Sequence, residues 1–135
     1  MNSFKFNPNQ LIIGTVLSLI FMIVGSNDVM SAVYIVCPDS SGDFPNIQTA
    51  VQGSVDGDTI ELTDGVFSGL GNRDIDYRGK AITIKSQSGN AENCIIDING
   101  EFDGISQRGF LFEHDEGNES VLRDLTIINA VADGP

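Results

Sequence analysis

The sequence predicts an all-β solenoid, in which short strands stack coil upon coil behind an N-terminal capping helix. Short apolar strands separated by Gly, Asn and Asp turns follow one another without helices between them, which excludes βαβ units. Similar triplets also recur: Ile60-Glu61-Leu62 leads to Ile82-Thr83-Ile84 at a step of 22 residues, and that triplet leads to Leu125-Thr126-Ile127 at 43, close to two steps. A β-sandwich would explain the number of strands but neither the repeat nor the helix.

The predicted capping helix runs from Pro45 to Val55. Pro45 suits a first helical turn, where its missing N–H has no partner in any case, and Asn46 is a candidate N-cap. After the helix, Gly57 can take the left-handed conformation and lead the chain into a strand at residues 59–62. One face of the helix is apolar, because apolar or small residues recur at steps of three and four: Ile47, Ala50, Val51, Ser54 and Val55.

Alternate side chains of the strands are expected to point inward and to stack from coil to coil, because side chains on a strand alternate between its two faces. The expected inward pairs are Ile60 and Leu62, Ile82 and Ile84, Phe110 and Phe112, and Leu125 and Ile127. The apolar strand at residues 33–36 is expected to lie along the helix and to close this end of the stack.

The stretch from Gly42 to Leu62, GDFPNIQTAVQGSVDGDTIEL, is followed by DGVFSG. Together they resemble the N-terminal cap and first coil of right-handed parallel β-helix proteins, the pectin lyase-like group. The resemblance covers Tyr34 to Asn129. It implies that residues 33–135 are the N-terminal part of a right-handed parallel β-helix domain, with the short helix plugging one end. Since the sequence stops in a turn directly after a strand, it is expected to be either the N-terminal portion of a longer protein, in which further coils follow, or a truncated gene product.

The pectin lyase-like group includes pectate and pectin lyases, pectinesterases, polygalacturonases and uncharacterised surface proteins. No catalytic motif of these enzymes is matched, so the sequence predicts no catalytic, cofactor-binding or metal-binding residue and no cofactor. We expect a non-catalytic, secreted or cell-surface module whose partner is extracellular polysaccharide or the cell surface. The alternative is the N-terminal fragment of a polysaccharide-active enzyme, similar to a pectate lyase or a pectinesterase.

The charge of the chain limits its partners. The 135 residues carry 19 acidic and 7 basic side chains, a formal net charge of −12. Binding to nucleic acid or to an anionic membrane needs Lys and Arg, so neither is expected. Polyuronate substrates would also be repelled without bridging cations. In the predicted register, no two basic residues stack on neighbouring coils, and no anion clamp is expected.

Residues 1–32 are predicted to be a leader. The apolar run from Leu11 to Val24 follows a single basic residue, Lys5, and is short for a membrane span. A cleaved signal peptide is favoured over an uncleaved N-terminal anchor, with cleavage contexts at Val24-Gly25-Ser26 and Met30-Ser31-Ala32. Export to the outside of the cell or to its surface is therefore expected.

Two groups of acidic residues are candidates for chemistry. Glu113, Asp115, Glu116 and Glu119 surround His114, and an oxygen-rich cluster of this kind can hold Ca²⁺. A solvated turn is the preferred interpretation, because no EF-hand or GGxGxD pattern is present, and His114 is expected to be a surface residue rather than a general base. Asp74 and Asp76, two residues apart on a strand, could form a carboxylate pair, although ordinary outward-facing residues are preferred.

The remaining candidates are structural or concern modification. Cys37 and Cys94 are the only thiols; a disulfide between them and two unpaired thiols both remain open. Neither cysteine lies in a CxxC pair, so the cysteines give no support for a zinc site. Asn118-Glu119-Ser120 fits the N-glycosylation sequon, which has meaning only in a eukaryotic secretory pathway. Asn129, just past the last strand, is a candidate for the asparagine ladders of β-helix proteins, a structural role.

Overall fold

The computed structural model describes residues 30–99, 101–102 and 105–131. All of the described strands and the helix lie in the compact unit that begins at Ser31. The apolar run predicted to be a leader lies outside the described residues. Within the described residues, no helix is long and apolar enough to cross a membrane.

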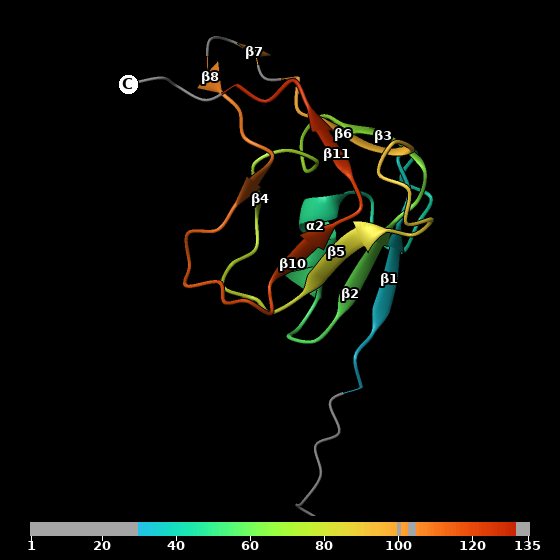
Figure 1. Cartoon of the computed structure of the whole chain (residues 1–135), viewed down its shortest axis with the longest axis vertical. Coiled ribbons are helices and arrows are strands. Elements are labelled where there is room, and N and C mark those ends of the chain that lie inside the picture. The colour runs from blue at the N-terminus through green and yellow to red at the C-terminus, as the bar shows by residue number, and fades with distance from the viewer. Residues whose placement is uncertain (1–29, 100, 103–104, 132–135) are drawn as a thin grey trace, which may run out of the picture. The chain divides into compact units, whose positions relative to one another are not determined.

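The described chain consists mainly of short strands, with one short helix among them (Figure 1). This confirms the predicted β-rich fold class. The elements in chain order are β1 (Val33–Val36), α2 (Ile47–Gly53), β2 (Thr59–Leu62), β3 (Gly65–Ser68), β4 (Ile75–Asp76), β5 (Thr83–Ser86), β6 (Cys94–Asp97), β7 (Glu101–Phe102), β8 (Ile105–Ser106), β9 (Phe110–Leu111), β10 (Val121–Arg123) and β11 (Thr126–Ile128).

Three sheets are parallel throughout. The first sheet has the order β1-β2-β5-β10, the second β11-β6-β3, and the third pairs β4 with β9. Only β7 and β8 form an antiparallel hairpin in the described chain. The chain runs through the first, second and third sheets as β2, β3 and β4, and again as β5, β6 and β9, with the hairpin inserted before β9. It then enters the first and second sheets once more as β10 and β11.

The predicted register was wrong. Ile60 pairs with Ile84, so the step between β2 and β5 is 24 residues rather than 22. Ile84 in turn pairs with Leu122, whereas the triplet that starts at Leu125 lies in the second sheet, where Ile127 pairs with Ile96. A shift of two residues keeps the same side chains on the same face, so the hydrophobic pattern could not exclude it. The loops between strands also differ in length, so no fixed step applies.

The corrected register changes one prediction about charge. Lys85 of β5 pairs with Arg123 of β10, so two basic residues do lie side by side on neighbouring strands, contrary to expectation. Both have acidic neighbours: Lys85 Nζ lies 3.1 Å from Glu61 Oε1, and Arg123 Nη1 lies 3.4 Å from Asp124 Oδ2. These side chains alternate with the buried Ile60 and Ile84 and therefore occupy the outer face of the first sheet.

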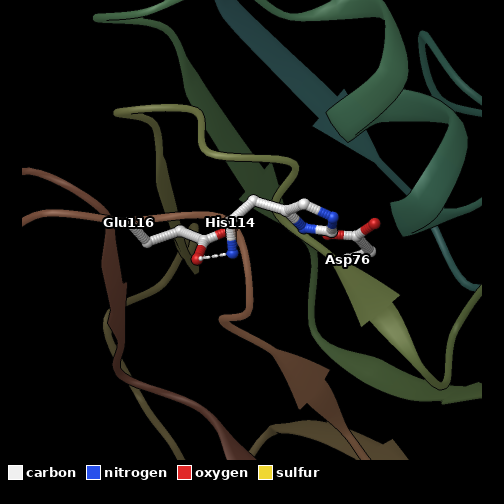
Figure 2. A group of neighbouring side chains, drawn as sticks. All are labelled: Asp76, His114 and Glu116. Atoms are coloured by element: carbon white, nitrogen blue, oxygen red, sulfur yellow. Dashed lines mark hydrogen bonds and ion pairs between the residues drawn. The ribbon is translucent and has the colours of Figure 1, made fainter.

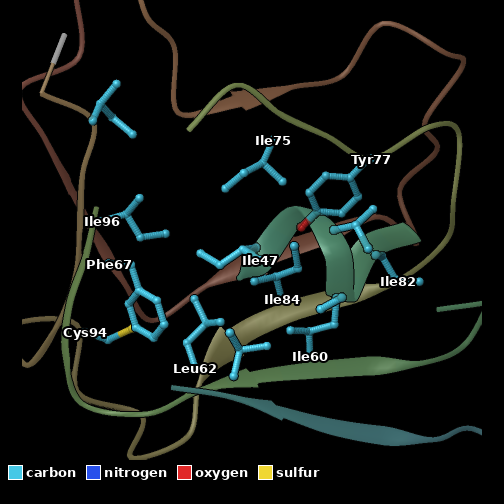
Figure 3. Close-up of a cluster of buried hydrophobic side chains, with 14 residues drawn as sticks. Ile47, Ile60, Leu62, Phe67, Ile75, Tyr77, Ile82, Ile84, Cys94 and Ile96 are labelled. Atoms are coloured by element: carbon cyan, nitrogen blue, oxygen red, sulfur yellow. The ribbon is translucent and has the colours of Figure 1, made fainter. Parts of the chain in front are cut away.

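The buried side chains from all three sheets and the helix meet in one core, as Figure 3 shows. The inward pairs expected on β2 and around the start of β5 are confirmed, because all four side chains are buried. In the other two pairs, Phe110 and Leu125 pack against the core. Phe112 stacks against Tyr77 and Ile127 pairs with the buried Ile96, as expected for inward residues, but they remain 48% and 40% exposed. Those two belong to the last strands and the adjoining loop, which no further described strand covers.

The helix begins at Ile47, two residues later than predicted, so Pro45 precedes the N-cap instead of lying in the first helical turn. The side chain of Asn46 accepts a hydrogen bond from the backbone N–H of Thr49 at 2.9 Å, which confirms the N-cap. The helix ends at Gly53, earlier than expected, and Val55 is exposed rather than part of the buried face, because the helical period stops before it. Gly57 has a φ of +91°, as its place in the turn before β2 requires.

Side chains from other elements hold this helix in place. The Lys80 ammonium donates hydrogen bonds to the carbonyl oxygens of Val51, Gln52 and Ser54 at 2.6, 3.0 and 2.6 Å. These carbonyls lie at the C-terminal end of α2, where they have no partners within the helix and where a cation is favoured. Lys80 therefore acts as the C-terminal cap of a helix almost 30 positions earlier in the chain.

The outer edge of β1 is covered by the loop that precedes the helix. The N–H of Ile35 donates to Asp43 Oδ2 and the carbonyl of Ile35 accepts from the N–H of Asp43, both at 2.7 Å. Phe44 forms a bridge with Val36, and its ring packs edge-on against Tyr34 at a centroid distance of 5.2 Å. Since α2 also packs against β1 and β2, this end of the first sheet is closed, as the sequence predicted for residues 33–36.

Replacing Lys80 by Met should destabilise the domain by about 1.5–3 kcal/mol, because the charged donor to three helix carbonyls is lost while most of the apolar stem is kept. Arg123→Met is the matched control, since it removes only an ion pair whose side chains are 55% and 38% exposed and should cost less than about 1 kcal/mol. Urea unfolding of both variants measures the difference. Equal losses would contradict the capping role of Lys80.

Candidate functional site

Three side chains of metal-ligating type gather beside the end of β4. They are Asp76, the last residue of β4, and His114 and Glu116, from the loop between β9 and β10 (Figure 2). One ligand atom from each lies within 4.8 Å of the others. The pairing of β4 with β9 brings these two segments together, since Asp76 stands opposite Leu111, three residues before His114.

Asp76 is held from both its backbone and its side chain. Its N–H donates to Gln48 Oε1 at 2.8 Å and its carbonyl accepts from Gln48 Nε2 at 3.2 Å, so the helix residue completes the strand as a neighbouring backbone would. Its Oδ1 accepts from the N–H of Arg78 at 2.8 Å and lies 3.2 Å from His114 Nδ1. The carboxylate is therefore aimed at the imidazole by contacts on both sides.

Glu116 ties its own loop to the turn after β4. Its Oε1 accepts from the N–H of Gly79 and its Oε2 from the N–H of His114, both at 2.8 Å. Burial alone would raise the pKa of Glu116, but the two backbone hydrogen bonds favour the carboxylate and lower the pKa below its ordinary value of 4.5. Glu116 is therefore ionised at neutral pH and fixes the loop against the turn.

Chemically, the group combines an imidazole and two carboxylates. The contact between Asp76 and His114 resembles the way a carboxylate orients a general base. Among the described residues, no hydrogen bond joins the His114 ring to a Ser, Thr or Cys side chain that could act as a nucleophile. The imidazole nitrogen of His114 and the carboxylate oxygens of Asp76 and Glu116 are also ligand atoms that bind divalent metal ions.

The other acidic candidates are dispersed. Asp74 does not form a pair with Asp76, because its Oδ1 accepts from the N–H of Arg108 at 3.0 Å, across from β4. Glu113 also turns to Arg108, with 3.1 Å between Oε1 and Nη1. Asp115 and Glu119 are exposed. The acidic residues that were a candidate for Ca²⁺ are thus divided, and only Glu116 joins the group with His114.

The two asparagine candidates lie at the surface. Asn118, the acceptor residue of the sequon, is exposed. Asn129 follows β11, and its Nδ2 donates to Asp97 Oδ1 at 2.8 Å on the neighbouring strand of the second sheet. This agrees with a structural role for Asn129, but its partner is an aspartate rather than a second asparagine of a ladder.

Sequence reasoning named Asp76 and His114 but assigned them to separate groups. They lie 38 residues apart, and the loops between them obscure the repeat. A signal was present in the alternating stretches around Ile75 and Phe110, which pair as β4 and β9. Aligning those two stretches would have placed the loop at His114 beside Asp76.

The chain matches no known protein-family model, and neither a curated protein nor a solved structure shows significant similarity to it. Its function is therefore inferred from the geometry of the described residues.

The two cysteines are free thiols. Cys94 is buried at the start of β6; its burial, and next the negative charge of Asp64, raise the pKa of its thiol to about 11. Cys37 is half-buried in the turn after β1. Since the thiolate is the reactive form, the two residues should differ in reactivity.

We therefore predict that iodoacetamide at pH 8 modifies Cys37 of the folded protein well before Cys94, and that both react at similar rates in guanidinium chloride. Mass spectrometry of the digested protein measures each site. A protein purified without reductant that offers no reactive thiol after unfolding would show that the cysteines are paired.

Proposed function

We propose that residues 33–135 form the N-terminal part of a right-handed parallel β-helix. The repeated passage of the chain through three parallel sheets in one order supports this. The covered edge of β1 supports its position at the first end of the stack, with α2 as the cap. At the other end, the apolar side chains of Phe112 and Ile127 are exposed, and they would pack against a further coil.

We further propose that the protein is a non-catalytic module, secreted or held at the cell surface, that binds extracellular polysaccharide. The observation behind this proposal is the outer face of the first sheet. Glu61, Lys85 and Arg123 lie in register there on three adjacent strands. This polar row, repeated at the strand spacing, offers hydroxyl-binding and carboxylate-binding groups of the kind that an extended sugar chain requires.

The alternative is part of a polysaccharide-active enzyme, similar to a lyase or an esterase. The contact between Asp76 and His114 favours it, because a carboxylate-oriented imidazole is a usual general base. Two observations count against it. The His114 side chain is 58% exposed to solvent, and within the described residues its ring has no hydrogen bond to a side chain that could act as a nucleophile.

We predict that the exported protein binds polygalacturonate in the presence of Ca²⁺, which offsets the repulsion between this anionic polymer and the net charge of −12, and that it does not cleave the polymer. Binding should weaken in the double variant Lys85→Ser/Arg123→Ser, because two cations of the outer face are lost, and should be unchanged in Arg78→Ser, which lies in a turn outside that face. Affinity electrophoresis in gels that contain polygalacturonate or methylated pectin measures the retardation of each protein.

The same samples decide between the two functions. Ultraviolet absorbance of unsaturated products and release of methanol would report lyase and esterase activity, each with and without Ca²⁺. Turnover that disappears in Asp76→Asn or His114→Ala would overturn the non-catalytic proposal. Equal retardation of the double variant and the wild type would remove the outer face of the first sheet as the binding surface.

Export is part of the proposal. Ala32 is already bound to the domain: its N–H donates to Asp58 Oδ1 and its carbonyl accepts from the N–H of Thr59, both at 2.8 Å. Cleavage before Ser26 would keep these contacts in a continuous chain, and cleavage before Ala32 would place the new ammonium group on the Asp58 carboxylate. We predict one of these two N-termini by sequencing of secreted material; an intact Met1 in the membrane fraction would show an anchor instead.

A further inference from the structure

We propose that Asp76, His114 and Glu116 bind a divalent transition-metal ion, with Zn²⁺ the best match, and that this ion fastens the loop before β10 to the end of β4. The site is separate from the outer face of the first sheet, so it does not depend on polysaccharide binding. The strand supplies Asp76 and the acidic loop supplies His114 and Glu116, so neither segment forms the site by itself.

The donor atoms select the kind of metal. One imidazole nitrogen with two carboxylates is a mixed set of nitrogen and oxygen ligands, which suits Zn²⁺ and its neighbours in the first transition row. Ca²⁺ takes six to eight oxygen ligands and Mg²⁺ keeps several waters in a shell of oxygens, so both gain little from a histidine. Three protein ligands leave a fourth position for water.

The spacing of the first two ligands already fits a metal ion. His114 Nδ1 and Asp76 Oδ1 are 3.2 Å apart. Neighbouring ligand atoms of a tetrahedral zinc site lie roughly 3.3–3.4 Å apart, given bonds of about 2.0–2.1 Å to the metal. An ion bound to both atoms would lie off the line that joins them, so the separation already fits while the imidazole must turn until its Nδ1 lone pair points at the ion.

Glu116 supplies the third ligand, and its loop is held close to the turn after β4. Glu116 Oε1 and Oε2 each accept one backbone hydrogen bond, so each oxygen keeps a lone pair for a metal ion. The loop packs so closely on the turn after β4 that a Cβ on Gly79 would lie 2.7 Å from the carbonyl oxygen of His114. The backbone thus holds the three ligands near one another before any ion binds.

The charges around the site are mixed. Arg78 is the opposing charge, with its Nε 4.0 Å from Asp76 Oδ2, but its side chain is 55% exposed and can turn away. The adjacent Asp115 is exposed and adds negative charge to the loop. The net charge of −12 also raises the local concentration of cations.

The test uses the exported protein and ZnCl₂, CaCl₂ and MgCl₂ as probes. Titration calorimetry should show one Zn²⁺ per chain and much weaker binding of the other two ions. His114→Ala should weaken Zn²⁺ binding by about tenfold or more, because even residues that only support a ligand change metal affinity by that factor. Glu119→Gln is the matched control: it removes one exposed charge of the same loop and should leave the affinity unchanged.

The chain contains a single histidine, which allows a second measurement on the unaltered protein. In ¹H–¹⁵N spectra of the imidazole, saturating Zn²⁺ should shift Nδ1 and place the remaining proton on Nε2. The melting temperature should rise with Zn²⁺ concentration in the wild type but not in Asp76→Asn. Binding as tight in His114→Ala as in the wild type, an unchanged imidazole spectrum, or equal affinity for Ca²⁺ would each overturn the proposal.

Discussion

The helix that closes the first sheet depends on hydrogen bonds from outside itself. A helix of seven residues is too short to be stable alone in water. Its C-terminal carbonyls are satisfied by Lys80, and the side-chain amide of Gln48 pairs with the backbone of Asp76. Both partners come from β4 or the turn after it. The helix is therefore stable only after the chain has passed once through all three sheets, and the cap and that first passage form a single folding unit.

The same contacts position the candidate site. Because Gln48 fixes the backbone of Asp76, the direction of the carboxylate is set by the helix, while the loop that carries His114 is set by the pairing of β4 with β9. The phenol of the buried Tyr77, next to Asp76, donates to the carbonyl of Val121 at 2.8 Å and ties β4 to the strand after the loop. A substitution of the buried Tyr77 should therefore also change the positions of Asp76, His114 and Glu116.

Much of the fold was readable from the sequence, but its register was not. Asn46 marked the start of the helix and the alternation in β2 marked its buried face, because both are local properties of a few residues. The pairing of Ile60 with Ile84 depends on how long each connecting loop is, and no periodicity reports that length. The same limitation applied to the candidate site. Asp76 and His114 were recognised as candidate residues, but their proximity depends on the pairing of β4 with β9, two strands of only two residues each.

The covered edge of β1 gives the molecule a direction. Asp43 and Phe44 occupy the side on which another strand could add, whereas in the described chain no strand pairs with the far side of β10. The ribosome releases the segment with the covered edge first. Each later strand of the first sheet can then pair only with the uncovered edge of the strands already formed. Growth of the sheets can then proceed in the order of synthesis. A nascent chain that is halted midway then carries one unpaired edge of the first sheet instead of two, which leaves fewer sites for edge-to-edge aggregation.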